Sequence, residues 1–173
     1  SELAALGFTF PATILITYFG VGLGIGTSAL VARALGSKNL VQARAMTTAS
    51  MLIGLLIGLA FIIPALKLID VVFPILGPAP QPMELIDQFM SIWYFCMPLQ
   101  LMQFAGTAVI RASGNARLHG ILMTWSAVVN AVLDPLLIFG IGPFPAMGIG
   151  GAALATVITF CFNVIAILWY LSV

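Results

Sequence analysis

Residues 121–139 read Ile-Leu-Met-Thr-Trp-Ser-Ala-Val-Val-Asn-Ala-Val-Leu-Asp-Pro-Leu-Leu-Ile-Phe, and Asp134 is the single charged side chain in this stretch. About 20 predominantly apolar residues are the length of a helix that crosses a bilayer. An aspartate at the centre of such a helix costs about 2.5 to 3.5 kcal/mol on insertion scales, so it usually faces a polar cavity. No Lys or Arg stands within ten positions of Asp134. The stretch therefore predicts a membrane-spanning helix that carries a functional carboxylate.

The rest of the chain has the same apolar character. Hydrophobic residues make up 62% of the 173 residues and charged residues 6%, with a mean hydropathy of +1.19, whereas soluble domains carry about 25% charged residues. We expect an all-α integral membrane protein in which residues 1–173 form a single partial transmembrane bundle. Five stretches are long and apolar enough to span a bilayer: 8–34, 45–66, 85–110, 121–139 and 149–171.

The basic residues predict the orientation of these spans. The second connection carries only Lys67 and the fourth none, while the first and third connections carry the other five, which are Arg33, Lys38, Arg44, Arg111 and Arg117. Because cytoplasmic loops are rich in Lys and Arg, we expect the N-terminus outside, the C-terminus in the cytoplasm, and a multi-pass protein of the inner (plasma) membrane. A net charge of +1 without a basic run gives no reason to expect a nucleic-acid partner.

Polar groups next to Asp134 complete a candidate cation or proton site. Asn130 lies four residues earlier, so on a helix its amide shares a face with the carboxyl group. Pro135 has no N–H, which leaves the carbonyl of Ala131 without its helical partner. The three oxygens could bind one proton or one Na⁺. A buried carboxylate that only ties helices together by hydrogen bonds is the structural alternative.

The third span contains a second polar group of residues around Pro98. A helix interrupted by proline often lines a cavity, and methionine adapts to ligands of different shape. We therefore consider Tyr94, Met97, Gln100 and Gln103 as substrate-cavity residues. Core packing by Met97 and hydrogen bonds between helices from the two amides explain the same residues nearly as well.

Two patterns of small residues predict structure more than function. Gly20, Gly22, Gly24 and Gly26 alternate in the first span, and Gly54 and Gly58 occur in the second. Such residues let helices approach closely in a membrane, and a cavity wall or a hinge is the alternative role. The pattern V-x-R-A-x-G occurs at 31–36 and again at 109–114. In both copies we expect the arginine to offset the helix dipole and the glycine to supply the left-handed residue that ends the helix. A gating role for Arg33 or Arg111 is the alternative.

Several enzyme motifs are absent from the sequence. It has no G-x-x-x-x-G-K-[ST] loop, no H-E-x-x-H and no G-x-S-x-G. We therefore expect no enzyme and no cofactor. An intramembrane acid with an amide neighbour, together with proline-interrupted helices, instead indicates a secondary transporter.

Four segments in this order resemble the multidrug and toxic compound extrusion (MATE) family: 22–36, 111–115, 130–140 and 147–156. The resemblance implies a protein of twelve helices in two six-helix bundles that exports small organic cations in exchange for Na⁺ or H⁺. The five spans would then be helices two to six of one bundle, more similar to the N-terminal half, and the rest of the transporter chain would be a partner.

The resemblance also extends the candidate coupling site. It implies that Asn130 and Asp134 on the fifth helix bind the cation with a polar residue of the sixth helix, for which Thr156 is the nearest match. It further implies an acidic residue on the first helix, which this chain does not contain, so the site in this chain is incomplete.

The mechanism that we expect starts with Asp134 taking up H⁺ or Na⁺ from outside, after which the helix bends near Pro135 and substrate is released. Direct competition between substrate and ion for Asp134 is an alternative order. Two other functions also stay open. A lipid-linked oligosaccharide flippase would need a cationic cavity, and a non-transporting membrane scaffold would not need Asp134.

Overall fold

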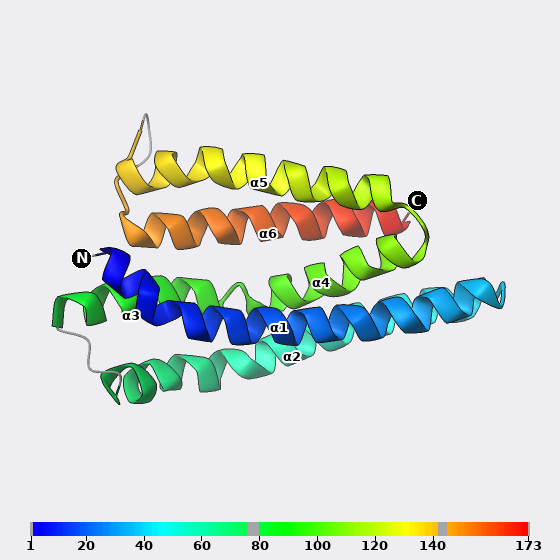
Figure 1. The fold of residues 1–173 in the computed structure, drawn as a ribbon, viewed down its shortest axis with the longest axis horizontal. Helices are drawn as coiled ribbons and strands as arrows, with labels where there is room; N and C mark the ends of the chain where they lie inside the picture. The colour runs from blue at the N-terminus through cyan, green and yellow to red at the C-terminus, as the bar shows by residue number, and fades with distance from the viewer. Residues whose placement is uncertain (1, 76–79, 142–144, 173) are drawn as a thin grey trace.

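The computed structural model describes residues 2–75, 80–141 and 145–172, and every element in it is a helix (Figure 1). The helices are α1 (Glu2–Gly36), α2 (Leu40–Ile75), α3 (Pro80–Tyr94), α4 (Met97–Ala112), α5 (Ala116–Phe139) and α6 (Ile149–Ser172). This all-helical architecture agrees with the expected fold class.

The helices lie side by side along the long axis of the molecule, with the N-terminus at one end and the C-terminus at the other (Figure 1). Helices α1 and α2 form one antiparallel pair, α5 and α6 form the other, and α3 and α4 follow each other between the pairs (Figure 1). Helix α4 packs against α1, α2 and α6, and ten of its 16 residues are buried. It is the central helix of the bundle.

The expected third span, 85–110, is two helices in the structure. Helix α3 ends at Tyr94 and α4 begins at Met97, and the Cys96 N–H donates to the Trp93 carbonyl across the break at 2.9 Å. Pro98, in the first turn of α4, has no N–H to donate to the Tyr94 carbonyl. The proline therefore removes the hydrogen bond that would join α3 to α4.

Four described helices are each long and apolar enough to cross a membrane: Thr9–Gly36, Leu40–Lys67, Ala116–Phe139 and Ile149–Ser172. Helices α3 and α4 follow one another and together make one further pass. Added to the four spans above, this gives an odd number of passes among the described helices. An odd number agrees with the position of the two ends of the chain at opposite ends of the molecule (Figure 1). Large apolar side chains such as Leu15, Tyr18 and Trp169 are at least 70% exposed, as expected for helices that face lipid or other membrane helices.

Glycines of the first two spans are divided by the face on which they lie. A Cβ on Gly20 would overlap the Phe104 ring, and a Cβ on Gly58 would overlap the backbone of Pro98. Gly24 and Gly54 also approach the backbone of α4, at Phe104 and Leu101. One small-xxx-small pair on α1 and one on α2 thus hold α4 between them, which agrees with the expected close packing.

Gly22 and Gly26, the other pair in the first span, have no atom within 4 Å of an added Cβ. The expectation of close packing is therefore wrong for this pair within the described residues. The physical reason is angular, because residues two apart on a helix point to different sides.

The ends of α1 and α4 have the same backbone structure. At each end the second residue beyond the helix cap donates its N–H to the carbonyl five residues back, Asn39 to Ala34 at 3.0 Å and Asn115 to Ile110 at 3.2 Å. The left-handed residue that this motif requires is Gly114, with φ 83°, after α4, but Lys38, with φ 57°, after α1. The expectation for Gly114 is confirmed, and the expectation for Gly36, which is the last residue of α1, is wrong.

Candidate functional site

Helix α5 carries the acidic candidate. The Asn115 Oδ1 caps its N-terminus by accepting from the Leu118 N–H at 3.0 Å, and Gly140, in the left-handed region with φ 67°, ends it. Asn130 and Asp134 lie one helical turn apart and both are half-buried. Within the described part of the chain, neither side chain has a hydrogen-bond partner. A carboxyl group and an amide are thus available together near the C-terminal end of a membrane-spanning helix.

Thr156 of α6 lies at about the depth of this pair. The two helices are antiparallel, and Gly151 packs against α5 so closely that an added Cβ would lie 2.5 Å from the Leu137 carbonyl oxygen. Thr156 lies five residues after Gly151 on α6, and Asp134 lies three residues before Leu137 on α5. Because the helices are antiparallel, both steps run in the same direction from this contact. The Thr156 hydroxyl donates to the Ala152 carbonyl of its own helix at 3.1 Å. No hydrogen bond joins Thr156 to Asn130 or Asp134 among the described residues, so its role as an ion ligand stays a prediction.

The oxygen atoms near Asp134 determine which ions this site could bind. Pro135 lies inside α5, so the Ala131 carbonyl receives no hydrogen bond from it. Carboxylate, amide and carbonyl oxygens suit a proton or a hard cation such as Na⁺. Among the residues with described positions, no three His, Cys, Asp or Glu side chains cluster as a transition-metal site would require.

A second polar group lies deeper in the bundle and joins three helices. Asn163 of α6, only 2% exposed, donates from Nδ2 to the Gln103 Oε1 of α4 at 3.2 Å. Its Oδ1 lies 2.8 Å from the hydroxyl of Ser126 of α5. The single hydroxyl proton serves either Asn163 or the Leu122 carbonyl, which is 2.6 Å away. We call this group the Gln103–Asn163–Ser126 bridge.

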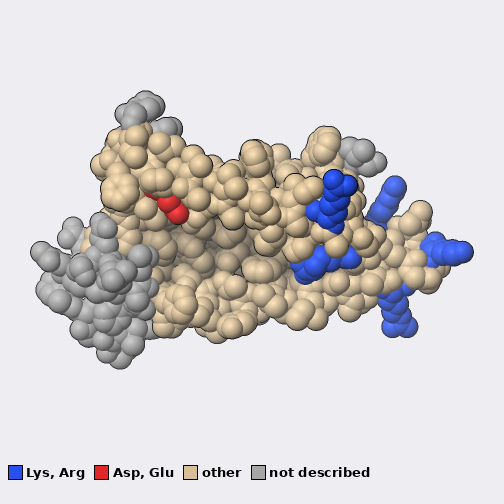
Figure 2. Space-filling view, turned by 45° about the horizontal axis from the view of Figure 1, so that its top comes forward, with Lys and Arg blue, Asp and Glu red and all other residues tan. Residues whose placement is uncertain are grey.

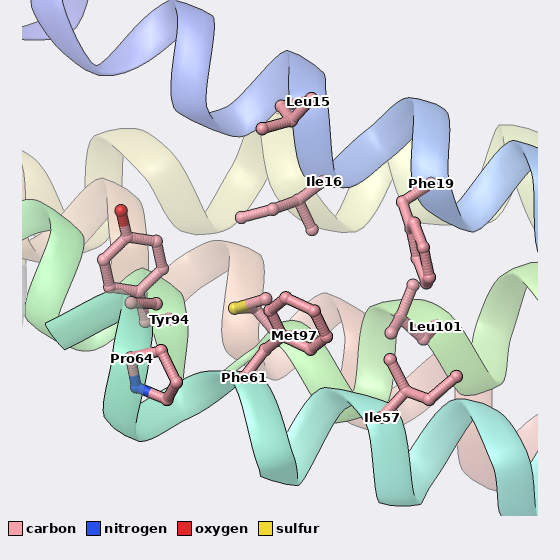
Figure 3. Close-up of a pocket in the computed structure, with 10 residues that line it drawn as sticks. Leu15, Ile16, Phe19, Ile57, Phe61, Pro64, Tyr94, Met97 and Leu101 are labelled. Atoms are coloured by element: carbon pink, nitrogen blue, oxygen red, sulfur yellow. The ribbon is translucent and has the colours of Figure 1, made fainter. Parts of the chain in front are cut away.

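An apolar cavity of about 380 Å³ lies on the other side of α4 (Figure 3). Figure 3 shows Leu15, Ile16 and Phe19 entering it from α1, across from Phe61 and Ile57 of α2. The break between α3 and α4 forms part of its wall. The full lining is Leu15, Ile16, Phe19, Ile57, Phe61, Pro64, Ala65, Tyr94, Met97 and Leu101.

The four expected substrate-cavity residues separate into two groups. Tyr94 and Met97 line the apolar cavity (Figure 3). Gln100 instead donates from Nε2 to the Thr17 hydroxyl of α1 at 3.3 Å, and Gln103 belongs to the bridge described above. Both amides thus make the hydrogen bonds between helices that were the alternative explanation, and contact with substrate stays a prediction for all four residues.

Asn163 and Ser126 are functional candidates that were not expected from the sequence. The signal was present but weaker than that of Asp134, because an amide within an apolar span usually makes a hydrogen bond between helices. The apolar residues of the cavity, such as Phe61 and Leu15, gave no comparable signal. A Phe or Leu in a membrane span looks the same whether it faces lipid, a neighbouring helix or a cavity.

Charge is distributed along the long axis of the molecule. On the face drawn in Figure 2, Lys and Arg side chains gather at one end, whereas acidic surface lies toward the other. Arg33 lies in the last turn of α1, Lys38 between α1 and α2, and Arg44 near the start of α2. Arg111 lies in the last turn of α4 and Arg117 in the first turn of α5. Helix α6 has no charged residue. The candidate coupling site therefore lies far from these cationic groups.

Proteins similar to this chain in sequence and in fold are described as transporters. The chain is 37% identical over 158 residues to a protein described as "FAD transporter" from Shewanella oneidensis, a match covering 91% of this chain and 35% of that protein. An inward-facing structure of a multidrug resistance MATE family transporter matches 98% of this chain and 38% of its own, with a TM-score of 0.90 and 28% identity. An outward-facing structure of such a transporter matches with a TM-score of 0.89 and 28% identity, and the match covers 98% of this chain and 37% of that transporter's chain.

The chain thus spans little more than a third of the length of these relatives, and its fold is close to both the inward-facing and the outward-facing structure. The MatE family model matches residues 1–136, which include the α5 carboxyl and its amide neighbour. With the all-helical bundle and the order of its helices, this match shows that the chain belongs to the MatE family.

Proposed function

We propose that this chain is part of a longer secondary antiporter that exports organic cations, including drugs, in exchange for H⁺ or Na⁺. The observation that carries the proposal is the pair Asn130 and Asp134, half-buried and without hydrogen-bond partners in the described structure. An acidic group held in a membrane span is costly and is retained where ions or substrates pass. The match to multidrug transporter structures supports the same reading.

Ion binding would act through the charge of Asp134. When the carboxylate takes up H⁺ or Na⁺ from outside, with Asn130 and Thr156 as further oxygen ligands, its negative charge is neutralised. A neutral site no longer favours a hydrated cavity, so the conformation in which the helices repack becomes more stable. The unsupported Ala131 carbonyl before Pro135 allows α5 to bend there. Substrate release would follow from this repacking.

The apolar cavity between α1 and α2 supplies a binding surface for the lipophilic part of a substrate. Its volume of about 380 Å³ falls within the range of roughly 300–1,000 Å³ that small-molecule sites occupy. Tyr94 and Met97 line one wall, and the thioether of Met97 is flexible. These two residues would contact the substrate, while Gln100 and Gln103 would act as supports.

Export of a flavin dinucleotide is the second candidate function, because the relative described as "FAD transporter" is 37% identical. A dinucleotide carries phosphate groups that need Arg, Lys or helix N-termini. In this chain five of the six basic residues lie at the α1–α2 and α4–α5 connections. Phosphate recognition would therefore depend on the rest of the longer protein, whereas the apolar cavity suits a lipophilic cation.

The orientation of the chain is a proposal of the same kind. The protein is a multi-pass membrane protein, and the positive-inside rule would put the α1–α2 and α4–α5 connections in the cytoplasm of the inner membrane. The N-terminus of the chain would then be outside and its C-terminus inside. A cysteine introduced at Lys38 should resist a membrane-impermeant thiol reagent in intact cells, and labelling there would contradict this orientation.

The function is tested with the full-length protein in sealed vesicles. Efflux of a fluorescent organic cation and of FAD is followed under a proton gradient and then under a sodium gradient, for wild type and Asp134→Asn. We expect the substitution to abolish gradient-driven export of the organic cation, and the effective gradient identifies the ion. Asp87→Asn is the matched control, because Asp87 is an exposed acid on α3.

Unchanged export by Asp134→Asn would show that the carboxyl is structural and would refute the coupling mechanism. Gradient-driven export of FAD without export of the organic cation would replace the first candidate function with the second. Equal loss of activity in Asp87→Asn would point to a general effect of acidic residues, again against a specific role for Asp134.

A further inference from the structure

The Gln103–Asn163–Ser126 bridge lies on the same helix face as the candidate coupling site. Ser126, Asn130 and Asp134 follow each other at intervals of four residues on α5, so they form one stripe along the helix. Ser126 is about 12 Å along the axis from Asp134, at 1.5 Å per residue. The bridge therefore holds α5 two turns below the carboxyl group.

Helix α5 has few other connections to the centre of the bundle. Its packing partner is α6, and its contact with α4 is slight. Leu137 is its only buried residue. Asn163 lies within hydrogen-bonding distance of Gln103 on α4 and of Ser126 on α5, so it connects the helix that carries Asp134 to the central helix. Below the bridge, the Asn115 Nδ2 donates to the Tyr170 hydroxyl of α6 at 3.1 Å.

Between Ser126 and Leu137 no described side chain of α5 makes a hydrogen bond to another helix. At the C-terminal end of α5, Leu137 is buried and Gly151 of α6 packs against its carbonyl, which also accepts from the Met147 N–H at 3.0 Å. Asn130 and Asp134 have no partner in the described structure, and Pro135 removes a backbone hydrogen bond. Helix α5 is thus held at the bridge and again at Leu137, while the segment between them, 130–135, has no side-chain hydrogen bond to another helix in the described structure and can bend. This arrangement divides the helix at the level of the bridge.

We propose that Asn163 is a positioning residue for the coupling site: through Ser126 it fixes the lower part of α5 against α4, so that ion binding at Asp134 bends only the segment between the bridge and Leu137. This inference rests on the proposed function of Asp134. Asn163 itself is 2% exposed and contacts Ser126, two helical turns from Asp134, so it does not bind the ion. Its effect is on the orientation of the Asn130 amide and the Asp134 carboxyl relative to α6.

No other charged group of the packed elements faces Asp134. Helix α6 has none, and the only charged residue of α4 is Arg111 in its last turn, at the opposite end of the bundle. On α5 itself Arg117 and His119 lie in the first turn, about 22 Å or more along the axis from Asp134. A change in the titration of Asp134 after a substitution in the bridge would therefore come through the position of α5.

The test is an infrared titration of the Asp134 carboxyl band in the full-length protein, identified as the difference between wild type and Asp134→Asn. It compares Ser126→Ala and Asn163→Leu with Thr124→Ala, which deletes an exposed hydroxyl of the same helix. We expect both bridge variants to shift the proton affinity of Asp134 by about threefold. This factor corresponds to the average free energy of a hydrogen bond between membrane helices, about 0.6 kcal/mol. Thr124→Ala should not shift the proton affinity of Asp134. Ser126→Thr, which keeps the hydroxyl group, should have the wild-type value.

A bridge variant that folds and titrates like Thr124→Ala would overturn the inference. Ser126→Ala removes one oxygen atom from a half-buried position, so it keeps the test decisive if Asn163→Leu does not fold. The titration does not require transport. Unchanged export in Asp134→Asn would therefore refute the proposed function alone, while an unshifted titration would refute the positioning role alone.

Discussion

The contact between α2 and α4 at Gly58 leads to a sharp prediction about stability. A Cβ on Gly58 would lie against the Pro98 backbone, 2.6 Å from its nitrogen, and 3.0 Å from the Met97 carbonyl carbon. Backbone atoms cannot rotate away as a side chain can, so Gly58→Ala must separate the two helices. Overpacking of this kind costs about 1–3 kcal/mol. The substitution should also narrow or distort the neighbouring cavity, whose wall includes Met97.

This effect is measured by thermal unfolding of the full-length protein in detergent. Unfolding is monitored through labelling of the Cys96 thiol, which is buried in the folded protein. Gly22→Ala is the matched control, because nothing lies within 4 Å of a Cβ at that position. We expect Gly58→Ala to unfold at a lower temperature and Gly22→Ala to unfold at the wild-type temperature or above, since Ala favours a helix. Equal stability of the two variants would refute the assignment of Gly58 to the α2–α4 contact.

Two further substitutions test the helix ends in the same assay. Lys38→Gly should raise the unfolding temperature, because Lys38 has φ 57° and a non-glycine residue in the left-handed region costs about 1 kcal/mol. Lys38→Ala keeps the Cβ and should not raise the unfolding temperature. An equal rise in Lys38→Ala would attribute the effect to the loss of charge. Asn115→Ala should destabilise by about 1 kcal/mol or more through loss of the α5 cap and of the bond to Tyr170. Tyr170→Phe should lose only the second part, so an equal loss would contradict the capping role.

Helix α4 connects the two candidate functional regions. Its Gln100 bonds to α1 beside the apolar cavity, and Gln103, one turn later, bonds to Asn163 on the side of the coupling site. A displacement of α5 and α6 would therefore be transmitted to the cavity wall through α4. The break between α3 and α4, next to Tyr94 and Met97, is where that displacement could be absorbed.

The repeat shows how sequence and structure can differ in register. The matching letters align Arg33 with Arg111, but the backbone motif aligns Lys38 with Gly114 and Asn39 with Asn115. The two alignments differ by two residues. Each Asn also caps the following helix, since its Oδ1 accepts an N–H three residues later. The functional unit of the repeat is thus the turn between two helices, and the arginine lies outside it.

The sequence by itself determined that this chain is a helical membrane protein, because the number and length of apolar stretches depend only on composition along the chain. It also determined the coupling candidate, since the i and i+4 positions of Asn130 and Asp134 fix their common face without any tertiary contact. Resemblance to the family added Thr156, whose depth near Asp134 follows from the antiparallel packing of α5 and α6.

Only the tertiary structure decided which small residues pack, which amides are supports and where a cavity lies. Gly20 and Gly22 are alike in the sequence, but only Gly20 meets α4. Asn163 became significant only because Gln103 and Ser126 lie within hydrogen-bonding distance of it. These properties depend on distances between residues far apart in the chain, and in an apolar span the residue types that face lipid and those that face a neighbouring helix are the same.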